Sequence, residues 1–160
     1  RHDDSRGTLV EVFREEWQSD FRPIQWNAVT SEVGVLRGIH VHLRHWDYLV
    51  VLKGAMSLAV KDLRRNSPTS DLSAVVHLES DDLHAVIIPP LVAHGFYFHK
   101  PSLHIYAVSH YWDPDDELGC HWADPELNLP WQIAQPVLSE RDGQLPGLKT
   151  LMEQIRAAFP

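Results

Sequence analysis

The chain has 160 residues, a length that suits one domain, and we expect residues 1–160 to form a single domain. Its 22 acidic and 14 basic residues give a net charge of −8, and no Lys/Arg-rich run offsets that charge, so nucleic acid is not expected as a partner. The single cysteine, Cys120, excludes an intramolecular disulfide and a thiolate-rich zinc site.

The location of the protein is predicted from the same features. A chain with one cysteine fits a reducing compartment, and we expect it to be cytoplasmic. No apolar run approaches the ~18 residues of a membrane span, and the N-terminal RHDDSRG lacks the apolar segment of a signal peptide. We therefore expect no membrane partner.

In chain order, the sequence predicts short β-strands separated by turn-forming residues. Apolar or alternating runs cover residues 33–41, 48–52, 55–60, 74–78, 84–89, 94–99 and 103–112. Between them stand KG, RRNSPTSD, ESDD, PP and KPS, which are rich in turn-formers and charges. Many short strands with such punctuation indicate a sandwich or a barrel.

One helix is expected at the C-terminal end. Residues 146–159, PGLKTLMEQIRAAF, place apolar side chains three and four positions apart after Pro146 and Gly147. This spacing predicts an amphipathic helix that packs against the barrel. Met56 and Met152 are expected in the core.

Two histidines stand close together in one predicted strand. His40 and His42 lie two residues apart in a predicted strand, so their side chains should point to the same face. The spacing from Gly34 through His40, His42 and Asp47 to Gly54 resembles the first motif of metal-binding cupins, with Asp in place of their Glu. The run PPLVAH, from Pro89 to His94, suggests the second motif, although Leu91 stands where glycine is expected.

Two interpretations of these histidines remain open on spacing alone. Imidazoles and a carboxylate from His40, His42, Asp47 and His94 would suit a divalent transition metal. Alternatively, they are barrel-lining side chains that bond to one another or to water.

A more specific pattern covers nearly the whole chain. It runs through DSRGTLVEVFR (4–14), QWN (25–27), GVLRGIH (34–40), DLRRNSPT (62–69), IPPLVAHGF (88–96), SHYWDPDDELGCHWADP (109–125) and LSERD (138–142). With these motifs in this order and spacing, the chain resembles the dTDP-4-dehydrorhamnose 3,5-epimerase family, a cupin-fold group of nucleotide-sugar epimerases that works without a metal. This resemblance implies an all-β cupin, or jelly-roll, barrel with a short C-terminal helix and no cofactor.

The resemblance also implies a reaction and the residues that perform it. The family's substrate is a dTDP-linked 4-keto-6-deoxyhexose, whose ketone acidifies the neighbouring C–H bonds at C3 and C5. His40 falls on the catalytic base, Asp142 on the carboxylate that orients it, and Tyr106 on the proton donor across the ring. The sequence is thus predicted to encode an isomerase of deoxysugar biosynthesis.

Substrate-binding residues follow from the resemblance as well. Two arginines are expected to meet the diphosphate, and His94 matches a histidine near the sugar. In the family, Arg6 and Glu11 lie on a strand that reaches a partner's site, which implies a homodimer. The residues carried over are Arg6, Glu11, Gln25, Asn27, Arg37 and His94.

Arg37 poses a geometric question, because it stands three residues before His40. A regular strand would send these two side chains to opposite faces. Either Gly38 supports a bulge, or Arg37 acts from outside the barrel.

Several positions depart from the family pattern and are expected to alter the sugar-contacting shell. Tyr48 stands at the position assigned to a lysine that helps to hold the enolate oxygen, His42 replaces a glutamine, and Leu58 replaces an aspartate. Tyr48 and His42 are therefore candidates for substrate contact. Asp47 is expected to be exposed in a shortened loop, and Trp112 and Trp122 either line the pocket or cover the barrel mouth.

Three functions remain possible from the sequence. The leading one is a metal-independent epimerase of altered substrate or altered regiochemistry, inverting C3, C5 or both. The second is a metal-dependent cupin enzyme such as a dioxygenase or an isomerase. The third is a sugar-nucleotide-binding cupin without catalytic activity.

Overall fold

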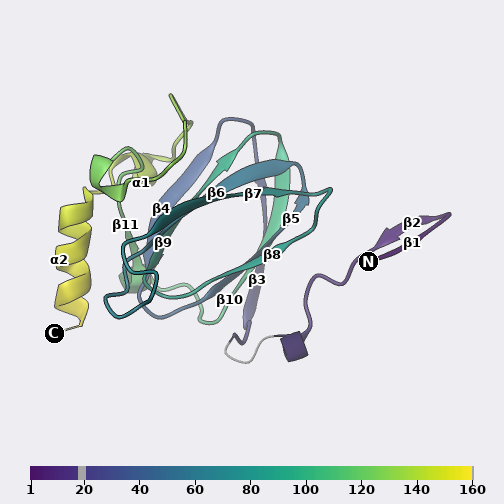
Figure 1. Ribbon diagram of the computed structural model, residues 1–160, viewed down its shortest axis with the longest axis horizontal. Coiled ribbons are helices and arrows are strands. Elements are labelled where there is room, and N and C mark those ends of the chain that lie inside the picture. The colour runs from purple at the N-terminus through teal and green to yellow at the C-terminus, as the bar shows by residue number, and fades with distance from the viewer. Residues whose placement is uncertain (18–20, 160) are drawn as a thin grey trace.

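The computed structural model describes residues 1–17 and 21–159, which form two facing β-sheets with a hairpin at one end of the chain and a helix at the other (Figure 1). The four-stranded sheet has the order β3 (Gln25–Ser31), β10 (Ser102–Val108), β5 (Asp47–Lys53) and β8 (Ala85–Ile88). The five-stranded sheet has the order β11 (Glu117–Gly119), β4 (Leu36–His42), β9 (Val92–Phe98), β6 (Ala55–Asp62) and β7 (Ser73–Glu79).

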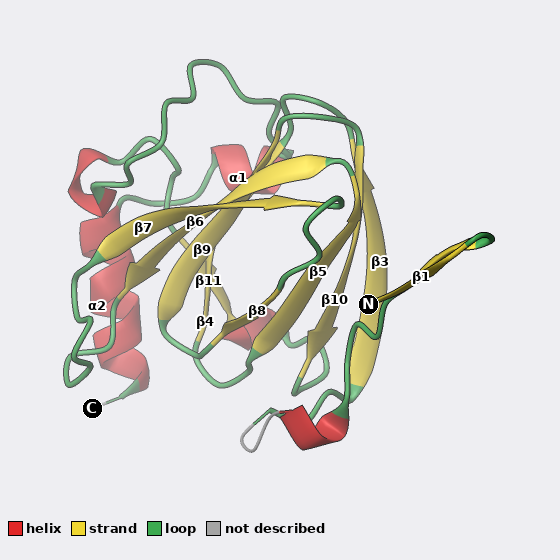
Figure 2. Cartoon of the chain, turned by 45° about the vertical axis from the view of Figure 1, so that its right-hand side comes forward, coloured by secondary structure: helices red, strands yellow, loops and turns green. Residues whose placement is uncertain are grey.

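All neighbouring strands in both sheets are antiparallel, and the chain crosses repeatedly from one sheet to the other. Between β4 and β5, for example, it leaves the five-stranded sheet and enters the four-stranded one. Figure 2 shows the two sheets facing one another. The predicted jelly-roll barrel is confirmed.

The remaining elements lie around this barrel. Strands β1 (His2–Asp4) and β2 (Gly7–Leu9) pair only with each other and project away from the sheets (Figure 1). The helices are η1 (Glu15–Trp17), η2 (Pro114–Asp116), η3 (Pro125–Leu127), α1 (Glu140–Gly143) and α2 (Leu148–Ala158). Within residues 1–17 and 21–159, no helix combines the length and the apolar character needed to cross a membrane.

Helix α2 packs where its sequence pattern predicts. Its apolar stripe, Leu148, Leu151 and Ile155, is buried against the outer face of the five-stranded sheet, where it meets Ile39 and Val41 of β4. A second cluster, which includes Leu49, Met56 and Leu58, fills the apolar part of the space between the sheets. Met56 is fully buried and Met152 packs beside α2's buried stripe, as expected.

The alternation of side chains along β4 and β5 decides which of them face the interior. Ile39 and Val41 point to α2, so His40 and His42 point together into the barrel, as predicted. On β5, Leu49 faces the interior, whereas Tyr48 and Val50 pack on the outer face of the four-stranded sheet. The barrel interior thus has an apolar part and a part lined by histidines.

A bulge in β4 answers the question about Arg37. The pairing of β4 with β9 shifts register between Gly38 and His40, and Gly38 has φ +115°, a backbone conformation that favours glycine. A Cβ atom on Gly38 would lie 2.7 Å from the carbonyl oxygen of His94, so the strands approach too closely for a side chain. The bulge brings Arg37 and His40 to the same pocket.

Candidate active site

A pocket of about 320 Å³ occupies the polar part of the barrel interior. Both sheets contribute to its walls, and the α1 region closes one side with Asp142. Most of the predicted site residues meet here. They are Gln25, Asn27, Arg37, His40, His42, Asp47, His94, Tyr106, Trp112 and Asp142.

The predicted dyad is formed by residues 102 positions apart. His40 Nε2 lies 2.8 Å from Asp142 Oδ1, and the backbone N–H of Gly38 donates to Asp142 Oδ2 at 3.2 Å. Asp142 is held in place because Ser139 caps α1 by accepting a hydrogen bond from the Asp142 N–H at 3.0 Å. This arrangement fixes the carboxylate on the His40 ring.

Opposing effects set the protonation state of Asp142. Burial acts to raise its pKa, but the hydrogen bond and charge of His40, together with the Gly38 N–H, outweigh burial and hold the pKa below its usual value. The group is therefore a carboxylate at neutral pH. A carboxylate can only accept, so the proton between the two side chains is on His40 Nε2, and the neutral ring has its free lone pair on Nδ1.

Tyr106 lies on the wall opposite the dyad. It belongs to β10 in the four-stranded sheet, whereas His40 belongs to β4 in the five-stranded sheet. Partial burial raises the pKa of the Tyr106 hydroxyl, and the carboxyl groups of Asp47 and Glu117 add to this rise. The hydroxyl therefore keeps its proton at neutral pH and can act as a donor.

Three of the predicted binding residues are placed on the pocket wall by β3 and β4. Gln25 Nε2 donates to Asn27 Oδ1 at 2.9 Å, and Asn27 Nδ2 is buried without a hydrogen-bond partner in the described part of the chain. Arg37 Nε donates to Ser31 Oγ at 3.0 Å. Arg37 Nη2 also donates to the Thr30 carbonyl at 3.3 Å. The Asn27 amide and the remaining N–H groups of the Arg37 guanidinium can therefore donate to acceptor atoms of a ligand.

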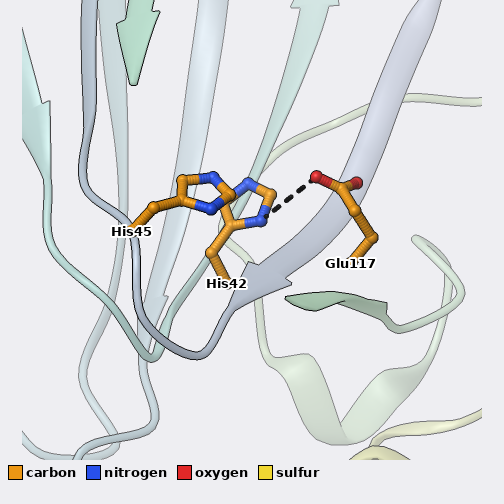
Figure 3. A group of neighbouring side chains, drawn as sticks. All are labelled: His42, His45 and Glu117. Carbon is orange, nitrogen blue, oxygen red and sulfur yellow. Dashed lines mark ion pairs between the residues drawn. The ribbon is translucent and has the colours of Figure 1, made fainter. Parts of the chain in front are cut away.

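A cluster of histidines and carboxyls forms the deep end of the pocket, and we call its five members, His42, His45, Asp47, His94 and Glu117, the polar cluster. Figure 3 shows His45 stacked on His42, with ring centroids 3.7 Å apart, and Glu117 beside His42. The distance from His42 Nδ1 to Glu117 Oε1 is 3.5 Å.

Burial keeps the centre of the polar cluster uncharged. It lowers the pKa of His42, with a further contribution from His94, and it lowers the pKa of His94 itself to about 4. It raises the pKa of Asp47 to about 8, with Glu117 and Asp116 adding to the rise. Removal from water disfavours the charged forms of these three side chains.

The structure corrects the expectations for Tyr48 and Asp47. Tyr48 does not face the pocket: its ring lies between Phe13 and Phe21 on the outer face of β5, and its hydroxyl donates to the Val12 carbonyl. Asp47, expected to be exposed, is 6% exposed and lines the pocket. At the start of β5, the pocket-facing side chain is therefore Asp47.

The N-terminal residues carried over from the resemblance lie outside the pocket. Arg6 pairs with Asp4 at 2.6 Å and Glu11 with Arg14 at 2.5 Å, all on the exposed segment that leads from β1 to η1. Trp112 lines the pocket, whereas Trp122 packs beside α2. Leu58 is buried in the apolar part of the interior.

Sequence reasoning missed some pocket residues. His45 and Glu117 were not singled out, yet both belong to the polar cluster. Glu117 lies within SHYWDPDDELGCHWADP, but a carboxylate in an acidic run gives no sign of facing inward. Its position follows from the pairing of β11 with β4, which sets Glu117 opposite His42.

A jelly-roll barrel with a histidine–aspartate pair and a tyrosine on opposite walls of one pocket is a class of site suited to proton transfer at carbon. The family model for dTDP-4-dehydrorhamnose 3,5-epimerase matches residues 1–150, and the chain belongs to this family.

Individual relatives agree with the family assignment. The dTDP-4-dehydrorhamnose 3,5-epimerase of Pseudomonas aeruginosa is 33% identical over 151 residues, which cover 88% of this chain and 83% of the relative. The crystal structure of dTDP-6-deoxy-D-glucose-3,5-epimerase from Legionella pneumophila, in complex with dTDP-4-keto-L-rhamnose, superposes with a TM-score of 0.85 at 28% identity, covering 95% of this chain and 86% of that one.

A solved structure of an enzyme named for inversion at one carbon is also similar to this chain. ChmJ, a 3'-monoepimerase from Streptomyces bikiniensis in complex with dTDP-quinovose, has a TM-score of 0.80 at 29% identity and covers 98% of this chain and 90% of its own. The proteins similar to this chain therefore include enzymes named for inversion at one carbon and at two.

Proposed function

We propose that this protein is an isomerase that inverts C3, C5 or both in a dTDP-linked 4-keto-6-deoxyhexose, in deoxysugar biosynthesis. The observation that carries the proposal is the 2.8 Å contact between His40 Nε2 and Asp142 Oδ1 at the pocket wall. Its support is membership of the epimerase family and similarity to solved structures that bind dTDP-sugars.

The first step is removal of a proton from the carbon next to the ketone. The lone pair on His40 takes this proton, and the electron pair of the C–H bond moves to the ketone oxygen to give an enolate. Asp142 stabilises the imidazolium that forms and holds the ring in the tautomer that leaves Nδ1 free.

The second step is return of a proton on the opposite face of the sugar. Tyr106 projects from the facing sheet and keeps its hydroxyl proton at neutral pH, so it is the donor. Inversion requires a base and a separate proton donor on opposite faces of the sugar, because a base that also returned the proton would restore the original configuration. Only protons move, so the reaction requires no redox cofactor.

The substrate's nucleotide diphosphate is assigned to the side of the pocket that carries β3 and β4. Arg37 offers a guanidinium there, and Gln25 and Asn27 offer amide groups. Guanidinium groups bind phosphate oxygens through two parallel hydrogen bonds. His42 and His94 lie in the deep end and are assigned to the sugar.

We further propose a homodimer in which the N-terminal segment of one protomer completes the pocket of its partner. The β1–β2 hairpin projects away from its own barrel (Figure 1), and Arg6 and Glu11 are exposed there. Leu9, Ile24 and Trp26 are large apolar side chains that are exposed in the single chain, and a partner would cover them. A cytoplasmic location stays a prediction.

The reaction is tested by incubating the protein with a dTDP-4-keto-6-deoxyhexose in deuterated water and following C3 and C5 by NMR. Deuterium should enter at the inverted carbon and not in a His40→Asn variant. His84→Asn, which changes an exposed histidine outside the pocket, is the matched control. Absence of exchange at both carbons across a range of nucleotide sugars would refute the proposal and leave a sugar-nucleotide-binding protein.

The shared site is tested by mixing two inactive dimers. His40→Asn and Arg6→Ala proteins should each be inactive or weak, and mixing after subunit exchange should restore activity, because a hybrid dimer contains one site free of both changes. Equal activity before and after exchange would contradict a site built from two protomers.

A further inference from the structure

The centre of the polar cluster contains polar atoms that converge without hydrogen-bonding one another. Asp47 Oδ2 lies 3.5 Å from His42 Nε2 and 3.8 Å from His94 Nε2. Both distances exceed those of ordinary hydrogen bonds. Asp47 Oδ2 is also buried without a hydrogen-bond partner among the described residues, although orphaned buried acceptors are costly.

The hydrogen bond at the other side of His94 fixes what its Nε2 presents. His94 Nδ1 lies 3.0 Å from the backbone carbonyl oxygen of Val92. A carbonyl only accepts, so the Nδ1–H donates and the neutral ring carries its lone pair on Nε2. That lone pair is directed toward the side of the ring where Asp47 lies. The two atoms thus face one another 3.8 Å apart without a hydrogen bond between them.

His42 completes a set of three ligand atoms. His42 Nε2, His94 Nε2 and one Asp47 oxygen all lie within 4.8 Å of one another, and all three residues are buried. His42 Nδ1 lies 3.5 Å from Glu117 Oε1 and has no hydrogen-bond partner among the described residues, so a carboxylate stands behind this ring without being bonded to it. The backbone carbonyl of Val92 accepts from the His94 Nδ1–H at 3.0 Å, as the outer partner of a metal-bound imidazole does.

The spacing of these atoms suits a metal ion. Ligands placed about 2.0–2.2 Å from an ion in tetrahedral geometry are about 3.4 Å apart. The observed separations of 3.5 and 3.8 Å are close to this value. Two imidazole nitrogens and one carboxylate oxygen are a donor set for iron, manganese, nickel or zinc.

We propose that His42, Asp47 and His94 bind one divalent first-row transition metal ion, with a further coordination position open to the pocket. His40 is not a ligand in this site, because among the described residues its ring nitrogens do not converge with those of His42, Asp47 and His94. His45 supports the site from behind His42, and its Nδ1 is bonded to Asp116 at 2.8 Å. Glu117 is engaged by Arg141 at 3.1 Å and remains an outer partner.

A role for this ion follows from, and rests on, the proposed function. The enolate formed by His40 carries negative charge on the former ketone oxygen, and a cation beside the base would stabilise that charge. The family resemblance assigns this role to a lysine. In this chain the corresponding wall carries Asp47, His42 and His94, and none of the described residues that line the pocket is a lysine.

The site is tested without any sugar. Protein that has been stripped of metal with a chelator is titrated with Co²⁺ in the absence of oxygen, and the visible spectrum of the bound ion is recorded. In a second experiment, the heat of Zn²⁺ binding is measured by calorimetry. Wild type should bind one ion per chain with nitrogen ligation. His42→Ala, Asp47→Ala and His94→Ala should each weaken binding more than about 100-fold, because even outer partners of metal ligands contribute 10- to 100-fold.

His104→Ala is the matched control, since His104 is buried and lines the same pocket outside the polar cluster. It should keep Co²⁺ binding and the rise in melting temperature that Zn²⁺ produces. Wild-type protein that binds no Co²⁺ or Zn²⁺ overturns the proposal even if the variants do not fold. Binding that survives loss of Asp47 and His94 but depends on His45 and Glu117 overturns the assigned ligands.

The catalytic role has a separate readout. Stripped protein should lose deuterium exchange at C3 and C5 and recover it with Co²⁺. The catalytic role would be refuted if the protein binds one ion per chain but exchanges deuterium at the same rate when it is stripped. The metal site itself would then still stand. Loss of exchange in both stripped and loaded protein, with metal bound, would count against the role and against the proposed epimerase.

Discussion

Substitution of Asp142 by asparagine should slow proton transfer through a change of tautomer on His40. The two oxygens of Asp142 are not equivalent: Oδ1 accepts from His40 Nε2, and Oδ2 accepts from the Gly38 N–H. An asparagine must place its side-chain oxygen at the Gly38 N–H, because its NH₂ group in that position would face another hydrogen-bond donor. Its NH₂ then points at His40 Nε2, which must become the acceptor. The proton of the neutral ring moves to Nδ1, and the base is lost.

Two effects contribute to the expected fall in kcat of the Asp142→Asn protein. Loss of a charge-assisted hydrogen bond of about 1.5–3 kcal/mol to the imidazolium lowers the rate about 10- to 150-fold, because about 1.4 kcal/mol corresponds to a factor of ten. The wrong tautomer adds to this, and substitution of the carboxylate in comparable histidine–aspartate pairs costs about 10⁴-fold. We expect kcat to fall about 10³- to 10⁴-fold, with little change in KM.

The assay is the initial rate of deuterium exchange next to the ketone, with thermal unfolding measured on the same samples. Asp124→Asn is the matched control: Asp124 also accepts backbone N–H groups, from Glu126 and Leu148, but lies outside the pocket. It should keep the wild-type exchange rate at temperatures where it is folded. An Asp142→Asn protein that is folded and exchanges at the wild-type rate would refute the dyad.

Three further predictions follow from other parts of the structure. Tyr106→Phe should lower product formation about 10²- to 10⁴-fold while deuterium exchange through His40 continues, and equal loss of both by NMR would argue against Tyr106 as the donor. Leu151→Ala removes a fully buried side chain between α2 and the barrel, and should lower the free energy of unfolding in urea by about 2–5 kcal/mol; a loss below that range would mean that α2 adds little to stability. Asp62→Asn should cost about 1–3 kcal/mol at pH 7, because the carboxylate of Asp62 accepts hydrogen bonds from Arg64, Ser67 and Thr69. These bonds, that from Arg64 first, hold the pKa of Asp62 below its ordinary value of 3.8, so the contribution is present above that value and is lost as the pH falls below it. The stability difference between wild type and Asp62→Asn should therefore shrink in acid, and a difference that is constant between pH 7 and pH 3 would contradict this account.

Much of the barrel was predictable because its signals are local. The strands from β4 to β10 and helix α2 coincide with apolar runs and turn residues, and the burial of α2's stripe follows from spacings of three and four. Strands β1, β2 and β11 are three residues each, too short for a periodic signal, and they were not predicted. The four-residue helix α1 has a serine cap but no apolar repeat, so it was also missed.

The amino-acid sequence is enough to predict the fold class and the proposed proton-transfer residues, because ordered motifs from LRGIH to LSERD carry the family resemblance. Which side chains face the pocket depends on the three-dimensional fold. Side chains alternate along a strand, so a shift of one position reverses the face, and assignment by spacing chose Tyr48 where the strand presents Asp47. The same dependence on exact register, through the bulge at Gly38, brings Arg37 beside His40. Burial then gives Asp47, His42 and His94 their chemistry, which no local pattern of residues contains.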